Sequence, residues 1–210
     1  AFSAPIAGGV FVLEELVKRF EPKTTLATLI ATASGFASAH LLLGDAGTEL
    51  DTIEFRPPSF GQAGWVLVVG LLCGVLGVGY NALVMGGLRL ADTSRIPVEV
   101  RAAAIGVGIG AVAWFAPWLV GPGGNLTQSA LLGQGTLGVV LGVLVVRVVL
   151  GVVSYAALTP GGLFAPMLVL GSHLGLAVGI VADQLDANAP EAAGLALIGM
   201  AAFFTASVRA

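Results

Sequence analysis

The stretch Thr159-Pro160-Gly161-Gly162-Leu163-Phe164-Ala165-Pro166 decides how this chain is interpreted. Two prolines and two adjacent glycines do not support a continuous helix there, whereas the uncharged residues that follow, as far as Ala182, predict one. Amide groups at the start of a helix present about half a positive charge. Without a side-chain cation beside them, they favour weak, reversible binding of a small anion. On spacing alone, a simple kink in a spanning helix remains an open alternative.

The composition places the chain in a lipid bilayer. Of its 210 residues 57% are hydrophobic and only 10% are charged, and the mean hydropathy is +0.98. A surface of that charge density is not that of a water-soluble domain, and the same figures exclude intrinsic disorder. The net charge of −3 provides no basic surface for nucleic acid. The single cysteine, Cys73, has no partner in the chain for a disulfide and is expected to be a buried packing residue.

Uncharged segments predict the membrane helices, because a charge at the bilayer centre costs at least about 2.5 to 3.5 kcal/mol. Each segment has close to the roughly 20 residues that a spanning helix needs, or more, so the predicted fold is an all-α polytopic membrane protein. An amphipathic stretch, Ala4 to Leu16, precedes them. The segments are Thr24 to Gly44, Pro57 to Leu88, Ala102 to Val146, Val148 to Ala182 and Ala192 to Val208.

Several segments are predicted to be tilted or broken. The segment from Pro57 is longer than a vertical span requires, which predicts a strongly tilted helix. Pro117 and the glycine-rich turn 121–124 interrupt the third segment, and the motif that starts at Thr159 interrupts the fourth. Irregular backbone within a bilayer must be buried in protein or line a polar cavity, so these breaks are candidate sites. Glycines recur four residues apart and predict close helix packing at Gly70/Gly74, Gly138/Gly142 and Gly171/Gly175/Gly179.

The charges between the segments predict an orientation. Lysine and arginine gather in the first and third loops, which places those loops in the cytoplasm. The second loop and the loop after Ala182 are acidic and are expected outside. The residues concerned are Lys18, Arg19, Lys23, Arg89, Arg95 and Arg101 inside, and Asp45, Glu49, Asp51, Glu54, Asp183, Asp186 and Glu191 outside, with Arg209 inside at the end of the last helix.

Arg147 is the one cation between Ala102 and Ala182. Such a side chain must reach the interface, pair with another group or face a polar interior. We expect it to bind carbonyl groups at helix ends, in a structural role. His40 and His173 are isolated, and the chain has no motif with metal-ligand spacing, so we expect packing or hydrogen-bonding roles for them and no metal site.

Residues 162 to 166, Gly-Leu-Phe-Ala-Pro, match the GxFxP signature of the ClC family of chloride channels and proton-coupled chloride exchangers, and the sequence APMLVLGSHLG after them is similar to the family's. The N-terminal stretch Ala1 to Glu15 resembles the helix that follows the family's gating region, and Gly199 to Ala210 resembles another of its helices. The resemblance covers nearly the whole chain and implies a ClC-type fold with broken and re-entrant helices.

The resemblance also implies roles for individual residues. Backbone amides of Leu163 and Phe164, within the motif that begins at Gly162, would bind a central chloride, and Ala165 would help form an outer site. Glu15 falls where exchangers carry their internal proton-transfer glutamate, with Glu14 beside it at the proton entry. A carboxyl group at the inner end of an apolar helix is suited to accept and release protons. For both glutamates an ordinary solvated helix end is the alternative. Structural roles are implied for Pro166, Arg147 and Asn125; the last would cap a short re-entrant helix after the glycine-rich turn.

We expect residues 1–210 to be one partial membrane domain, cut at both ends. The family's GSGIP segment and the GREGP-type segment with its gating glutamate would precede Ala1, and the tyrosine of the inner gate and further helices would follow Ala210. The family is dimeric through four helices, so we expect a homodimer for the full-length protein. Only two of these helices, about Ala4 to Leu16 and Thr24 to Leu43, fall within this chain. Chloride, protons and the bilayer are the expected partners, with chloride as a ligand and no cofactor. A multi-pass protein of a prokaryotic inner membrane is expected.

The function expected is chloride/proton antiport by the longer protein, not enzyme activity, and three alternatives remain. A passive ClC chloride channel would lack the proton coupling. A different secondary transporter could also have broken helices and packed glycines. An intramembrane serine protease would need a serine and histidine pair, for which Ser34 with His40 or His173 is the available choice, although no GxSG motif supports it.

Overall fold

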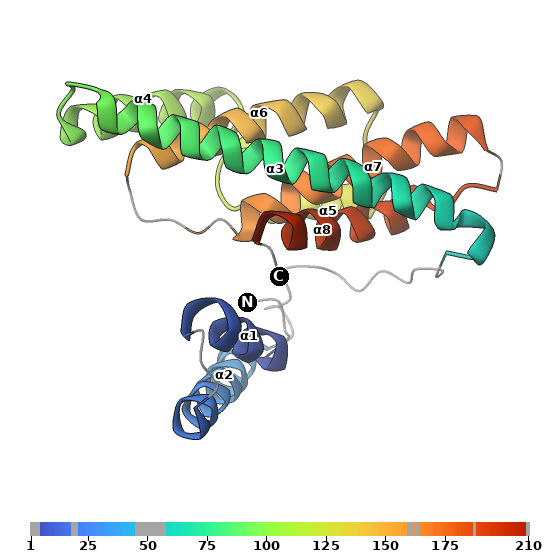
Figure 1. Cartoon of the computed structure of the whole chain (residues 1–210), viewed down its shortest axis with the longest axis horizontal. Helices are drawn as coiled ribbons and strands as arrows, with labels where there is room; N and C mark the ends of the chain where they lie inside the picture. The colour runs from blue at the N-terminus through green and yellow to red at the C-terminus, as the bar shows by residue number, and fades with distance from the viewer. Residues whose placement is uncertain are drawn as a thin grey trace. The chain divides into compact units, whose positions relative to one another are not determined.

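The computed structural model describes residues 5–17, 21–44, 58–158, 162, 164–186 and 188–208. These residues form eight α-helices and no strand, which confirms the predicted all-α fold (Figure 1). Five of the described helices are long and apolar enough to cross a membrane. The chain divides into two compact units, Ala1–Thr52 and Ile53–Ala210.

The first unit contains a pair of packed helices. Helix α1 (Pro5–Phe11) continues as a π-helical turn, η1 (Val12–Val17), and is followed by α2 (Pro22–Leu43). Gly9 lets α1 approach α2, because a Cβ atom there would lie 3.0 Å from the side chain of Leu29. Leu13 is buried in the same unit, so the predicted amphipathic stretch is helical and packs through one face.

The second unit contains six α-helices. Helix α7 is the most enclosed candidate span, with two thirds of its apolar window buried, and it packs against α8, α6, α5 and α3. The core of this unit includes Leu170 and Leu176 of α7 and Phe203 of α8. The helices are α3 (Ala63–Thr93), α4 (Val98–Phe115), α5 (Gly124–Leu131), α6 (Leu137–Ala156), α7 (Phe164–Leu185) and α8 (Ala192–Val208).

The predicted breaks are confirmed, but the predicted third and fourth segments are divided wrongly. The chain leaves helical geometry between Phe115 and Gly124, apart from the short 3-10 turn η4 (Pro117–Leu119), and again after Ala156. Arg147 does not separate two segments, because α6 runs through it without interruption. A buried arginine that binds protein groups can occupy the middle of a membrane helix.

Helix α3 is a single helix of 31 residues, about 46 Å at 1.5 Å per residue, against a hydrocarbon thickness of about 30 Å. Its length agrees with the predicted long helix, although α3 ends at Thr93 and not at Leu88. The first part of α3 lies parallel to α8. Cys73 Sγ is 3.5 Å from the carbonyl oxygen of Gly199, and Asn81 Nδ2 donates to the carbonyl of Ser207 at 2.9 Å.

The start of α3 lies beside the segment that follows α7. Gln62 Nε2 donates to the carbonyl of Asn188 at 2.7 Å, and Trp65 Nε1 lies 3.4 Å from a carboxylate oxygen of Asp186. Both segments therefore lie at the same end of this unit. This arrangement agrees with the orientation predicted from loop charges, which places both on the outer side.

Glycines allow α7 and α8 to approach until their backbones touch. A Cβ atom on Gly175 would overlap the carbonyl group of Leu195, and one on Gly179 would lie 2.5 Å from Cα of Ala192. Gly171 and Gly199 face each other in the same way. Close packing is thus confirmed for the glycines of α7.

The same prediction fails for the other two glycine pairs within the part of the chain that the structure describes. Nothing lies within 4 Å of a Cβ atom built on Gly70, Gly74, Gly138 or Gly142. Spacing of four residues identifies a potential contact face, but it does not identify which faces meet another helix.

Replacing Gly175 by alanine should force α7 and α8 apart, because the new methyl group has backbone and not a flexible side chain in its way. Overpacking of this kind costs about 1 to 3 kcal/mol. Gly138→Ala in α6 is the matched control, because its methyl group meets nothing within 4 Å. This substitution also replaces a helical glycine, which destabilises a helix relative to alanine. We expect the thermal unfolding midpoint in detergent to fall for Gly175→Ala and to stay or rise for Gly138→Ala. Equal midpoints would contradict the proposed role of the contact.

Candidate anion site

The first turn of α7 forms the candidate anion site. Gly162 is not helical and is exposed, and α7 begins at Phe164, so the predicted helix start is confirmed. Leu163 lies outside the described residues. The amide groups of a first turn have no acceptor within their own helix, and they point toward its N-terminal end. Pro166 fits this turn because a proline there gives up no intrahelical hydrogen bond.

Apolar side chains surround this helix start. The ring of Phe164 packs edge-on against Phe204 of α8, with ring centroids 4.8 Å apart and planes at 71°. Ala165 and Pro166 are half-buried, and Met167 is buried. The first turn of α7 contains no acidic residue. The positive end of the helix dipole is therefore not neutralised by a carboxylate of its own turn, which suits it to an anion.

Arg147 is buried between α6, α7 and the turn that precedes α5. It is 7% exposed, and its Nη1 donates to the carbonyl oxygen of Gly121 at 2.7 Å. A Cβ atom on Gly123 would lie 2.7 Å from Arg147 Nη2 and 2.6 Å from the side chain of Val169. The prediction that Arg147 binds a backbone carbonyl is thus confirmed, although the carbonyl belongs to the turn before α5 and not to a helix end.

Arg147 belongs to α6 but lies beside α7, and its position there affects the electrostatic potential at the first turn of α7. Val169, which lies against the same turn, is five residues after Phe164, or about 7.5 Å along the helix axis. The guanidinium group is always charged. Its field therefore adds to the positive potential around the first turn of α7, while its own hydrogen bond is made elsewhere.

The short helix after the glycine-rich turn is present, but the predicted cap is wrong. Helix α5 begins at Gly124, and Gly123 is its N-cap residue, without a capping side chain. Asn125 is already inside the helix and is exposed. Gly123 has φ of 86°, a left-handed conformation that glycine adopts without steric cost. A Cβ atom at this position would overlap the side chains of Arg147 and Val169, so a larger residue would not fit.

The two candidate proton-transfer residues lie in the first unit. Glu14 and Glu15 both fall in η1, and Glu14 is exposed. The side chain of Glu15 lies outside the described part. Lys18 and Arg19, which follow in the sequence, also lie outside it. Single π-helical turns are frequent at functional sites, but this one carries no chemical assignment by itself.

The serine and histidine residues have local hydrogen-bonding partners. Ser34 Oγ donates to the carbonyl of Ile30 at 2.7 Å, within α2. His173 is buried, with Nδ1 2.9 Å from the carbonyl oxygen of Val169, and His40 stacks on Phe36. These contacts agree with the packing and hydrogen-bonding roles expected of the histidines. Among the described residues no group of three or more His, Cys, Asp or Glu side chains could hold a metal ion.

Together these features define a multi-pass membrane protein with an interrupted helix whose first turn is suited to an anion. Comparison with known protein families matches residues 1–210 to the family described as voltage gated chloride channel. The chain belongs to this family, so its general activity is chloride transport across a membrane. Family members are channels or transporters and not enzymes.

Arg147→Gln tests whether the buried guanidinium stabilises the turn before α5. A hydrogen bond from a charged donor contributes about 1.5 to 3 kcal/mol, and a glutamine does not reach as far toward Gly121. We expect the free energy of unfolding to fall by an amount in this range. The matched control is Arg95→Gln, because Arg95 is exposed. Substitution of an exposed residue usually changes the free energy of unfolding by no more than about 0.5 kcal/mol. Denaturant unfolding in detergent measures both, and a neutral Arg147→Gln would show that the hydrogen bond is dispensable.

Proposed function

We propose that the protein of which these residues are part exchanges chloride for protons. The observation that carries the anion half of the proposal is the start of α7 at Phe164, in an apolar setting and without a carboxylate in its first turn. Amide groups at such a position bind a halide through partial charges only. The ion is held firmly enough to replace part of its hydration and weakly enough to leave.

In this proposal backbone amides of Leu163 and Phe164 bind the central chloride, and Ala165 contributes to an outer site. Gly162 leaves room for the ion because it has no side chain. The identity of the neighbouring side chains matters less than the position of the backbone, which the packing of Phe164 on Phe204 supports. No cofactor takes part, and the ion is the ligand.

The proton half rests on Glu15 and Glu14. By its position in the family motif Glu15 transfers the proton inside the protein, and Glu14 lies beside it at the aqueous entry. The exposure of Glu14 supports an aqueous entry. A passive chloride channel of the same family is the second candidate, and it would use the same anion site without these glutamates.

The proposed setting is a homodimer in a prokaryotic inner membrane. Several large apolar side chains of α2 are exposed, such as Leu26 and Ile30, with 61% and 58% of their surface accessible. Such a face needs lipid or another protein surface to cover it. A second copy of the full-length protein is the partner that we propose for it.

Ala165→Pro tests the role of a backbone amide directly. Proline removes the amide hydrogen but fits the first turn of a helix, so the fold should persist. Losing one hydrogen bond to a charged ligand, about 1.5 to 3 kcal/mol, should weaken chloride binding about 10- to 100-fold. Calorimetric titration of chloride into the purified full-length protein measures this change. Ala165→Gly, which keeps the amide, is the control and should bind within a few-fold of the original. Unchanged affinity in both variants would remove this amide from the site.

Glu15→Gln tests the proton half. In proteoliposomes that contain the full-length protein, we expect chloride flux to continue while coupled proton movement is lost, because glutamine cannot carry a proton. Glu21→Gln is the control, since Glu21 is exposed at the start of α2 and should leave the coupling unchanged. If the original protein moves no protons and Glu15→Gln changes nothing, the protein is a channel.

A further inference from the structure

Helix α4 has the fewest packing partners of the candidate spans in the second unit. Within the described residues its backbone approaches only α6 and η4, the Arg101 side chain adds a hydrogen bond to the end of α3, and none of its 18 residues is buried. Its apolar residues nevertheless continue around the whole helix. A helix that is apolar on all sides requires an apolar environment, and the contact with α6 covers only one side of α4.

Three of the large exposed apolar side chains of α4 form one stripe. Val100, Val107 and Trp114 are spaced seven residues apart, which places them on the same face of a helix. Their accessible fractions are 57%, 75% and 84%. The glycines Gly106 and Gly110 lie about one quarter of a turn away from this stripe. The face with the large side chains is thus distinct from the face with the small ones.

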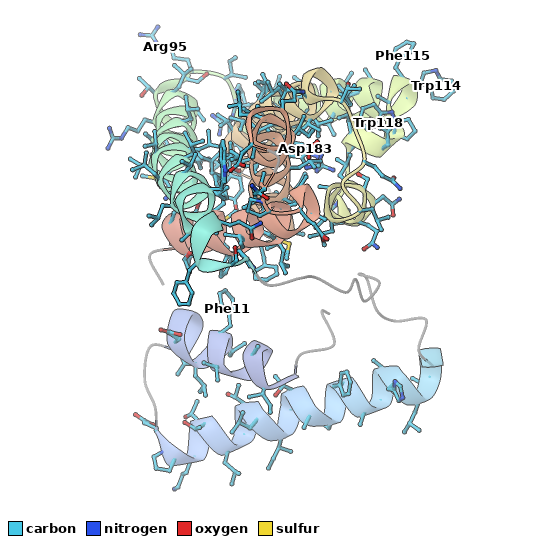
Figure 2. The ribbon with its side chains drawn as sticks, turned by 90° about the vertical axis from the view of Figure 1, so that its right-hand side faces the viewer. Phe11, Arg95, Trp114, Phe115, Trp118 and Asp183 are labelled. Atoms are coloured by element: carbon cyan, nitrogen blue, oxygen red, sulfur yellow. The ribbon has the colours of Figure 1, made fainter. Side chains whose placement is uncertain are left out.

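The two ends of α4 differ in the way that the two surfaces of a bilayer differ. At one end, Arg95 precedes the helix and is exposed, and Arg101 Nη1 donates to the carbonyl of Ala91 at the end of α3. At the other end, Trp114 and Phe115 are exposed, and Trp118 follows in η4. Figure 2 shows Arg95 on one side of the unit and the three aromatic residues gathered on the opposite side.

The length between these ends matches a bilayer. Eighteen residues of helix rise about 27 Å, against about 30 Å for the hydrocarbon core. Tryptophan is enriched where hydrocarbon meets the headgroups, and arginine is enriched at the cytoplasmic surface. This sequence of arginine, apolar stripe and tryptophan is that of a helix whose two ends lie at the two surfaces of the bilayer.

We propose that the stripe Val100, Val107 and Trp114 of α4 faces lipid directly, with the Trp114 indole at the outer headgroup boundary and Val107 near the bilayer centre. In this arrangement α4 fixes the depth of the second unit in the membrane. This inference is independent of chloride/proton exchange, because it holds equally for a channel. The competing occupant is another protein segment.

Spin labels on single cysteines distinguish the two occupants in the full-length protein, reconstituted in lipid vesicles after other reactive cysteines have been replaced. Labels at Val100, Val107 and Asp92 report collisions with oxygen, which concentrates in lipid, and with a water-soluble nickel complex. We expect the oxygen-to-nickel ratio to be highest at Val107, intermediate at Val100 and lowest at Asp92, which is exposed in the last turn of α3. An immobile label at Val107 that meets neither reagent would mean a protein partner. A label there that meets mainly nickel would mean water. Either result overturns the proposal.

Tryptophan fluorescence gives a second, independent test of the outer end. The difference between the original protein and Trp114→Phe isolates the emission of Trp114. We expect brominated lipids with shallow bromines to quench it more than those with deep bromines. Trp65→Phe is the matched control, because Trp65 is half-buried with its indole nitrogen near Asp186, and it should leave lipid quenching of the remaining emission largely unchanged. A Trp114 signal that no lipid quenches would place protein over this end of α4.

Discussion

The backbone contact between α7 and α8 is the constraint on which the second unit depends. Lipid tails are as apolar as leucine, so hydrophobic burial does not drive membrane helices together, and close van der Waals contact must do so. Gly171 and Gly175 on α7 and Gly199 on α8 allow that contact, because a methyl group at any of the three would overlap the backbone of the other helix. The contact fixes how α7 lies along α8. It thereby brings Phe164, at the start of α7, against Phe204 near the end of α8.

The second structural element at the site is Arg147. Removing a charge from water is costly, and arginine cannot avoid that cost by losing its proton. In this chain Arg147 Nη1 binds the carbonyl of Gly121, in a turn that needs a partner because its backbone is irregular. Arg147 thus provides a hydrogen-bond donor for the carbonyl of Gly121, and that carbonyl satisfies one of the donor groups of the arginine. Gly123 and Val169 lie against this arrangement, so α5, α6 and α7 meet at one position.

The helix breaks are well predicted from the sequence because proline and glycine act through local geometry. One break lies between Phe115 and Gly124, where Pro117 and the glycine-rich turn interrupt an apolar stretch, and at the other α6 ends at Ala156 before α7 begins at Phe164. Three features depend on tertiary structure and are not predictable in this way. Arg147 marks no boundary, because its hydrogen-bonding partner lies 26 residues earlier in the chain. Asn125 is not the cap, since the left-handed conformation of Gly123 already starts α5. Gly138 and Gly142 of α6 have the same spacing as the glycines of α7, yet a Cβ atom on either of them would meet nothing within 4 Å. The family motif at Gly162 to Pro166 supplied what periodicity alone could not, the identity of the ligand.

The electrostatic design of the site follows from what holds the ion. A lysine or arginine in direct contact would bind a halide as a full charge in a medium of low dielectric constant, where an ion pair is strong and slow to separate. The first turn of α7 offers partial charges instead. Arg147, with its Nη1 bound to a carbonyl, lies against the same turn as Val169, which is about 7.5 Å along the helix axis from Phe164. In the proposed site the guanidinium raises the local potential without contacting the ion. In the proposed site an anion would therefore be attracted into an apolar environment and would still exchange, which is the balance that transport requires.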